Sequence, residues 1–330
     1  MPRLGYVLSC EEHGPNELVR HARRAEEVGF DYVLISDHYH PWISRQGNSA
    51  FVWCVIGAIA RETERIRVGT GVTCPTVRIH PAVIAQAAAT AAVMLPGRFF
   101  LGVGSGENLN EHIVGAPWPS VERRHRMLEE AVDVMRLLWR GGQHSHYGEH
   151  YTLDNARLFT LPDEPPLIYL AAHGEKAATL AGRIADGFIG VVATDEMTRC
   201  FDAAGGAGKP KIGMVKVCYA ADESEGRRIA REWWPTIALR GQLSQDLALP
   251  SHFEAATQLL TEDDVAARVP CGPDTARHLR LIESYASVGY DHVTVHQIGP
   301  DQESFFRFYA DEILPRVQPH ARHEEVVQSR

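Results

Sequence analysis

The chain has 330 residues, of which 45% are hydrophobic and 23% charged, and its formal net charge is −9 at pH 7. This composition excludes the disordered and collagen-like classes, and the acidic balance argues against general nucleic-acid binding, which depends on a basic surface. The apolar stretch 81–95 is too short to span a bilayer, and no signal-peptide pattern begins the chain. We therefore expect a cytoplasmic protein with no membrane partner.

Short β-rich segments alternate with longer helical patterns, which is typical of parallel βα units. Eight strands are predicted at 4–8, 32–35, 67–70, 99–103, 167–171, 187–191, 212–219 and 293–296. Helices are predicted at about 16–29, 51–62, 81–94 and 122–139, and near residues 176, 224, 274 and 302.

Three helix-to-strand joints, at 26–36, 181–190 and 286–296, resemble one another, and each has a glycine suited to a left-handed turn. This weak repeat favours an α/β fold of the (β/α)8 TIM-barrel type, as a single domain over 1–330, and a doubly wound sheet is the alternative fold. Two segments interrupt the pattern: 144–161 is predicted to be a small hairpin, and 235–270 is a candidate lid.

The segment SDHYHPW (36–42) follows the second predicted strand, where the catalytic loops of a barrel lie. His38 beside Asp37 is suited to act as a base near neutral pH, and Trp42 offers an apolar wall for a planar ring. The alternative is that His38 and His40 are surface residues and that Trp42 packs on the barrel rim.

A glycine-rich segment, GVGSGENLNE (102–111), follows the fourth predicted strand. Glu107 occupies the position of the third glycine of a dinucleotide-binding motif, so we reject a Rossmann site. Gly106 permits close approach of a flat ligand, and Glu107 and Asn110 offer a carboxyl and an amide to a heterocycle. A tight turn with solvated polar residues is the alternative.

Cysteine and histidine spacing favours neither disulfides nor a metal. The six cysteines form no C-x-x-C pair, which is typical of reduced thiols. His144, His146 and His150 lie close together without a carboxylate or thiol at ligand spacing, so no metal site is predicted.

Together, SDHYHPW, GTGVTCPT (69–76) and GVGSGENLNE resemble the luciferase-like superfamily, and within it the coenzyme F420-dependent glucose-6-phosphate dehydrogenases. The similarity extends over nearly the whole chain. It implies a (β/α)8 barrel with insertions, usually a homodimer, that binds the deazaflavin coenzyme F420 and a small-molecule substrate.

The resemblance also assigns residues to the cofactor. It places Asp37 and His38 at the deazaflavin and implies a non-proline cis peptide between Gly71 and Val72. It also implies that Cys74, Gly106, Glu107 and Asn110 contact the cofactor and that Ala171, Ala172, His173 and Gly174 lie near its phosphate. The family usually has Thr at the position of Cys74 and commonly has Gly at the position of His173.

The implied reaction is hydride transfer between a carbinol carbon of the substrate and the deazaflavin. His38 would remove the hydroxyl proton, Glu107 would protonate the ring nitrogen, and Trp42 would position the substrate, with Glu11 near the same pocket.

The family's two lysines and one arginine that bind the sugar phosphate correspond here to Thr194, Ser244 and Arg268. Without the two lysines a phosphate would be poorly neutralised. The substrates left open are another sugar phosphate, an unphosphorylated alcohol and a reducible carbonyl. Two other functions stay open: an FMN-dependent luciferase-like monooxygenase, and a non-catalytic deazaflavin-binding protein.

Overall fold

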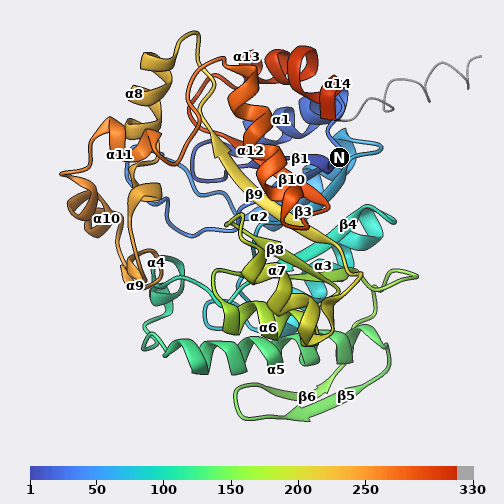
Figure 1. Cartoon of the computed structure of the whole chain (residues 1–330). Helices are drawn as coiled ribbons and strands as arrows, with labels where there is room; N and C mark the ends of the chain where they lie inside the picture. Colours follow the sequence, from blue (N-terminus) through green and yellow to red (C-terminus); the bar gives the residue numbers. More distant parts are fainter. Residues whose placement is uncertain (318–330) are drawn as a thin grey trace, which may run out of the picture.

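Eight parallel strands close into a barrel in the order β1-β10-β9-β8-β7-β4-β3-β2 in the computed structural model, which describes residues 1–317 (Figure 1). The barrel strands are β1 (Arg3–Leu8), β2 (Tyr32–Ile35), β3 (Arg67–Thr70), β4 (Phe99–Val103), β7 (Leu167–Ala172), β8 (Gly187–Gly190), β9 (Lys211–Val217) and β10 (His292–Gln297). The predicted (β/α)8 barrel is confirmed, and all eight predicted strands are present with boundaries that differ by at most two residues. Residues 318–330 of the predicted domain lie outside the described part.

Helices surround the barrel. The principal ones are α1 (Pro15–Val28), α2 (Val52–Glu62), α3 (Pro81–Met94), α5 (Val121–Trp139), α6 (Glu175–Ile184), α7 (Asp195–Phe201), α8 (Glu223–Trp233), α12 (Thr275–Ser287) and α13 (Gln302–Phe308). Shorter helical segments are α4 (Asn108–Glu111), η1 (His112–Val114), η2 (Asp202–Gly206), η4 (Tyr309–Ile313) and α14 (Leu314–Val317). No helix among residues 1–317 is long and apolar enough to cross a lipid bilayer.

Side chains alternate between the barrel interior and the helical layer, because successive residues of a strand point to opposite faces. One cluster of buried residues lies inside the barrel: Tyr32, Leu34, Phe100, Tyr169, Ile189 and Ile212, with Val72, Ala171 and Met214 packed against it. The other face of the strands forms the large core with the helices. The interior is therefore filled below the carboxyl ends of the strands, and a ligand must bind at those ends.

The three similar helix-to-strand joints, at 26–36, 181–190 and 286–296, differ in the backbone conformation of their glycines. Gly29 and Gly289 have φ values of 101° and 93°, and they end α1 and α12 in the left-handed conformation, as predicted. The prediction is wrong for Gly187, which has no left-handed φ among the described residues. A Cβ at Gly187 would lie 2.4 Å from the Tyr169 ring, so this glycine makes room for an interior side chain.

The first insertion is the predicted hairpin, with β5 (His144–Tyr147) paired antiparallel to β6 (Thr152–Ala156). It lies beside α5 outside the barrel (Figure 1), and the Glu130 carboxylate of α5 accepts hydrogen bonds from the backbone N–H groups of His150 and Tyr151. One of its histidines, His146, also contacts α5, with Nε2 3.1 Å from Glu130 Oε1.

The second insertion is helical, with η3 (Pro235–Ala238), α9 (Leu243–Asp246), α10 (Pro250–Thr257) and α11 (Glu262–Ala266). It approaches α4 in Figure 1, and the Asn108 side chain donates a hydrogen bond to the Asp246 carbonyl oxygen at 2.9 Å. The insertion therefore contacts the loop that follows β4, at the carboxyl end of the barrel.

Candidate active site

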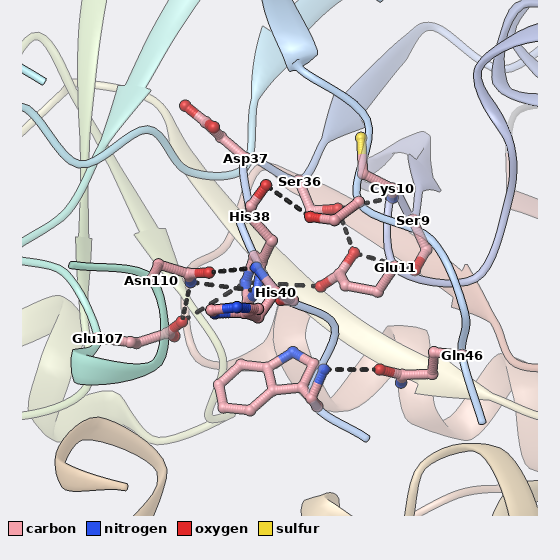
Figure 2. A network of polar contacts seen from close by, with 12 residues as sticks. Ser9, Cys10, Glu11, Ser36, Asp37, His38, His40, Gln46, Glu107 and Asn110 are labelled. Atoms are coloured by element: carbon pink, nitrogen blue, oxygen red, sulfur yellow. Dashed lines mark hydrogen bonds and ion pairs between the residues drawn. The ribbon is translucent and has the colours of Figure 1, made fainter. Parts of the chain in front are cut away.

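Loops that follow β1, β2 and β4 bring Glu11, His38 and Glu107 together at the mouth of the barrel (Figure 2). The His38 Nε2 atom lies 3.5 Å from Glu11 Oε1 and 3.5 Å from Glu107 Oε2. These residues are 27 and 69 positions apart in the chain, and they meet because the carboxyl ends of parallel strands share one edge. The predicted convergence of His38 and Glu107 is thus present in the structure.

The His38 ring is oriented by its second nitrogen. Nδ1 lies 3.1 Å from the carbonyl oxygen of His40, to which it donates when it carries a proton. Burial by itself would lower the pKa of His38, but Glu11 and Glu107 raise it, and the result is a pKa above the ordinary 6.5. This imidazole is therefore a stronger proton acceptor than an isolated histidine.

The two carboxylates beside His38 have opposite pKa shifts. Burial would raise the pKa of Glu11, but His38 and the Ser36 hydroxyl, which donates to Glu11 at 2.5 Å, lower it below 4.5. For Glu107, burial raises the pKa above 4.5, with Glu11 adding to the rise and His38 opposing it. Glu11 is therefore the anion of the pair, and Glu107 holds a proton more readily.

Asn110 connects the loops that follow β2 and β4. Its Oδ1 accepts hydrogen bonds from the backbone N–H groups of Tyr39 and His40, at 2.8 and 3.2 Å, and its Nδ2 donates to Glu107 at 3.2 Å. Asn110 belongs to α4, a short helix that was not predicted from the sequence. The helix forms because the N–H groups of residues 110 and 111 bond to the Glu107 carbonyl oxygen.

Asp37 lies apart from the His38 group. Its side chain is 1% exposed, its Oδ1 accepts from Arg78 at 2.9 Å, and its Oδ2 accepts from Thr73 at 2.8 Å. Figure 2 shows Asp37 pointing away from Glu11 and His38. Both carboxylate oxygens are therefore used within the protein, and Asp37 connects the loops after β2 and β3.

The loops after β3 and β4 pack closely against each other at two glycines. The Gly71–Val72 peptide bond is cis, as the resemblance implies. A Cβ at Gly104 would lie 2.8 Å from Val72 Cγ2, and a Cβ at Gly106, whose φ is 86°, would lie 2.6 Å from Cys74 Sγ. A side chain at either glycine would therefore collide with Val72 or Cys74.

The segment after β7 runs into the N-terminus of α6. Ala172 is buried, Ala171 is half-buried, His173 is exposed, and Gly174 is the N-cap residue. Among the described residues no side chain caps the N-terminus of α6, so its first amides can donate to an anion.

Trp42 forms the apolar wall of the site. Its ring centroid lies 5.2 Å from that of His38 and 5.2 Å from that of Phe253, which belongs to α10. The backbone N–H of Trp42 donates to the Gln46 side chain, which in turn donates to the Trp233 carbonyl oxygen. The second insertion therefore packs directly on a predicted site residue, as expected of a segment that covers the mouth.

The residues that replace the family's phosphate ligands are spread over three elements. Thr194 is the N-cap residue of α7, Ser244 is half-buried in α9, and Arg268 is exposed after α11. Within residues 1–317, no hydrogen bond, ion pair or ring contact joins their side chains to His38, Glu11 or Glu107.

Four charged or aromatic residues at the mouth were not predicted. Glu12 accepts from His296 at 2.6 Å, and the Lys216 ammonium lies 4.7 Å from the Trp234 ring centroid. Two of them could have been predicted from the strand pattern. His296 ends the eighth predicted strand, and Lys216 lies in the seventh at a position whose side chain points into the barrel.

Comparisons with known proteins agree with this geometry. The family model for luciferase-like monooxygenases matches residues 3–292. An F420-dependent glucose-6-phosphate dehydrogenase from Microbacterium testaceum is 37% identical over 328 residues, which cover 96% of this chain and 97% of the relative. A second one, from Nakamurella multipartita, is also 37% identical and covers 96% of each chain.

Among solved structures, an F420-dependent secondary alcohol dehydrogenase in complex with an F420-acetone adduct matches with a TM-score of 0.87 at 30% identity, over 94% of this chain and 98% of that chain. Since the family model covers most of the chain and the relatives exceed 30% identity over nearly all of it, this protein belongs to the luciferase-like monooxygenase family.

Proposed function

We propose that this protein is a coenzyme F420-dependent dehydrogenase that transfers a hydride between the carbinol carbon of an alcohol or sugar and the deazaflavin. The observation that carries the proposal is the placement of His38, with Nε2 3.5 Å from both Glu11 and Glu107, at the mouth of the barrel. The F420-dependent relatives support the choice of cofactor.

The residues present fit a flat heterocycle with an anionic tail. The Glu107 carboxyl group is 29% exposed and can donate a proton to a ring nitrogen, and Gly104 and Gly106 let the loops after β3 and β4 pack closely beside it. The free amides after Gly174 suit a phosphate. When bound, the deazaflavin supplies a two-electron hydride carrier.

The chain's own residues then handle the proton and exclude water. His38 accepts the hydroxyl proton of the substrate as hydride leaves the carbinol carbon, and Glu11 stabilises the resulting imidazolium. Glu107 holds a proton at its carboxyl group for delivery to the ring nitrogen, consistent with its raised pKa. Trp42 and Phe253 keep this side of the pocket apolar.

We further propose that a phosphate group is not the main determinant of substrate binding. Thr194 and Ser244 carry no charge, and Arg268 alone would neutralise a phosphate dianion only in part. A substrate recognised by its hydroxyl or carbonyl oxygens suits this pocket better than glucose 6-phosphate.

The test is titration of the purified protein with coenzyme F420 and with FMN, followed by a screen of alcohols, sugars and sugar phosphates for loss of deazaflavin absorbance. We expect F420 to bind more tightly than FMN and at least one alcohol or sugar to reduce it. Preferential FMN binding with oxygen-dependent turnover would favour a monooxygenase. Tight F420 binding without hydride exchange for any compound would favour a non-catalytic deazaflavin-binding protein.

A further inference from the structure

Lys216 enters the barrel mouth because of its position in β9. Ile212 and Met214 belong to the cluster inside the barrel, and Lys216 follows them at the next inward position of the strand. Its register partner on β10 is His296, which is also at the mouth. The strand pattern therefore directs a cation to the end of the barrel where the ligand binds.

Within residues 1–317, the Lys216 ammonium has no hydrogen-bond acceptor. It lies 4.7 Å from the centroid of the Trp234 ring, which stabilises it by a cation–π contact. Burial lowers the pKa of Lys216 below the ordinary 10.5, although the nearby Glu11, Glu12 and Glu107 partly oppose this shift. Among residues 1–317, no hydrogen-bond acceptor and no carboxylate within 4.0 Å pairs with this ammonium.

The neighbouring carboxylates already have other partners. Glu12 accepts from His296 at 2.6 Å and from the Gly299 backbone at 2.9 Å. Glu11 accepts from Ser36, and Glu107 accepts from Asn110. The three N–H donors of Lys216 are thus left for a ligand oxygen, because a buried donor without an acceptor is costly.

Lys216 and His38 approach the mouth from different sides. β9 is separated from β2 by β10 and β1 in the eight-stranded barrel. His38 lies 3.5 Å from Glu11 and Glu107, whereas Lys216 makes no ion pair within 4.0 Å of either. The His38 ring packs on Trp42 at 5.2 Å, whereas the Lys216 ammonium lies over Trp234. We therefore expect the two side chains to contact different parts of a bound substrate.

We propose that Lys216 binds a second oxygen of the substrate, distinct from the oxygen that reacts, and thereby selects diols and sugars over monoalcohols. This inference rests on the proposed dehydrogenase function. It specifies the substrate class: a carbinol with a further hydroxyl group nearby.

The test compares two pairs of substrates that each differ by one hydroxyl: 1,2-propanediol with 2-propanol, and D-glucose 6-phosphate with its 2-deoxy analogue. For each pair that it oxidises, we expect the wild type to have a higher kcat/KM for the member with the additional hydroxyl group. Lys216→Met should reduce that preference about 10- to 100-fold, which corresponds to the loss of one charge-assisted hydrogen bond. The loss should arise mainly from KM, with F420 binding unchanged.

Two further variants separate recognition from structure. Lys216→Arg keeps a cationic donor and should retain part of the preference. Lys211→Met makes the same chemical change at the other end of β9, where Lys211 pairs with Asp202, and should leave the preference intact even if stability falls.

The outcomes for Lys216 and for the proposed function are distinguishable. If the wild type oxidises either pair but Lys216→Met lowers kcat/KM equally for both members, the inference about Lys216 is wrong and the proposed function stands. If the wild type binds no F420, or reduces it with none of the four compounds or the wider screen, the proposed function itself is wrong.

Discussion

His38 is positioned by contacts from several separate segments. The His40 carbonyl orients Nδ1, while Glu11 and Glu107 lie near Nε2. Such positioning matters because a proton acceptor must keep its alignment throughout the reaction. The pKa shifts give the two carboxylates different roles: the lowered pKa of Glu11 keeps an anion beside the imidazole of His38, whose own pKa is raised, whereas the raised pKa of Glu107 favours its protonated carboxyl group.

We predict that His38→Ala binds F420 within a few-fold of the wild type but loses about 100- to 10,000-fold in kcat, the usual contribution of a general base. Fluorescence titration of F420 and steady-state turnover measure the two effects. His40→Ala is the matched control, because the His40 ring stacks on His112 and its Nδ1 atom lies 3.0 Å from the Leu109 carbonyl oxygen, and no ion pair within the described residues joins it to Glu11 or Glu107. Unchanged turnover in His38→Ala would remove this histidine from the chemistry.

Glu12→Gln tests the buried pair with His296. Burial would raise the pKa of Glu12, but His296 lowers it below 4.5, so the carboxylate stabilises the fold at pH values above 4.5. That contribution is lost as the pH falls through the lower pKa of the folded state. We expect Glu12→Gln to reduce the free energy of unfolding by about 1–3 kcal/mol at pH 7 and by progressively less as the pH falls below 4.5. Urea unfolding at several pH values measures this, and a difference independent of pH would contradict it.

At the scale of elements, the second insertion completes the mouth of the barrel. Phe253 of α10 is fully buried against Trp42, Ile43 and Leu109, which follow β2 and β4. The Ser44 backbone N–H donates to Glu254, and Arg124 of α5 donates to Gln245. The insertion is thus attached to two catalytic loops rather than to the barrel wall alone.

Phe253→Ala should remove the support behind Trp42. We expect a loss of stability of about 3–5 kcal/mol, typical of a deleted buried phenylalanine, and a higher KM for the substrate with little change in F420 affinity. Thermal unfolding and kinetics measure these effects. Leu259→Ala lies in the same insertion, but Leu259 is 93% exposed, so it should change neither. A KM in Phe253→Ala equal to that of the wild type would show that α10 does not shape the substrate pocket.

At the scale of the whole molecule, an apolar surface lies over α2 and α3. Phe51 and Val83 are 55% and 54% exposed, and Val93 and Met94 are exposed beside them. They border a groove that includes Ile56, Ile79 and Ala87. A contiguous apolar surface of this kind is typical of a protein–protein contact.

The homodimer implied by the resemblance stays a prediction, and we expect it to use this surface. Val83→Asp should shift the protein from dimer to monomer, measured by sedimentation or by light scattering on size-exclusion chromatography. Val114→Asp is the control, because Val114 is exposed elsewhere, after α4. A monomeric wild type, or a Val83→Asp variant that remains dimeric, would contradict this interface.

Much of the barrel could be predicted because its signals are local. The alternation of apolar strands with helical patterns located all eight strands, and a glycine or proline marked many helix ends. The helical form of 235–270 was not predicted, because its short helices are stabilised by packing of Phe253 and Val265 rather than by a long periodic pattern.

The sequence by itself determined which residue types follow each strand, and so placed His38, Trp42 and Glu107 at the same end of a barrel. Only the tertiary structure decided which side chains meet there. It paired Asp37 with Arg78, brought Glu11 to His38, and left Lys216 without an acceptor among the described residues. The physical reason is that pKa shifts and donor pairing depend on distances of a few ångströms between segments far apart in the chain, and only the closed barrel sets those distances.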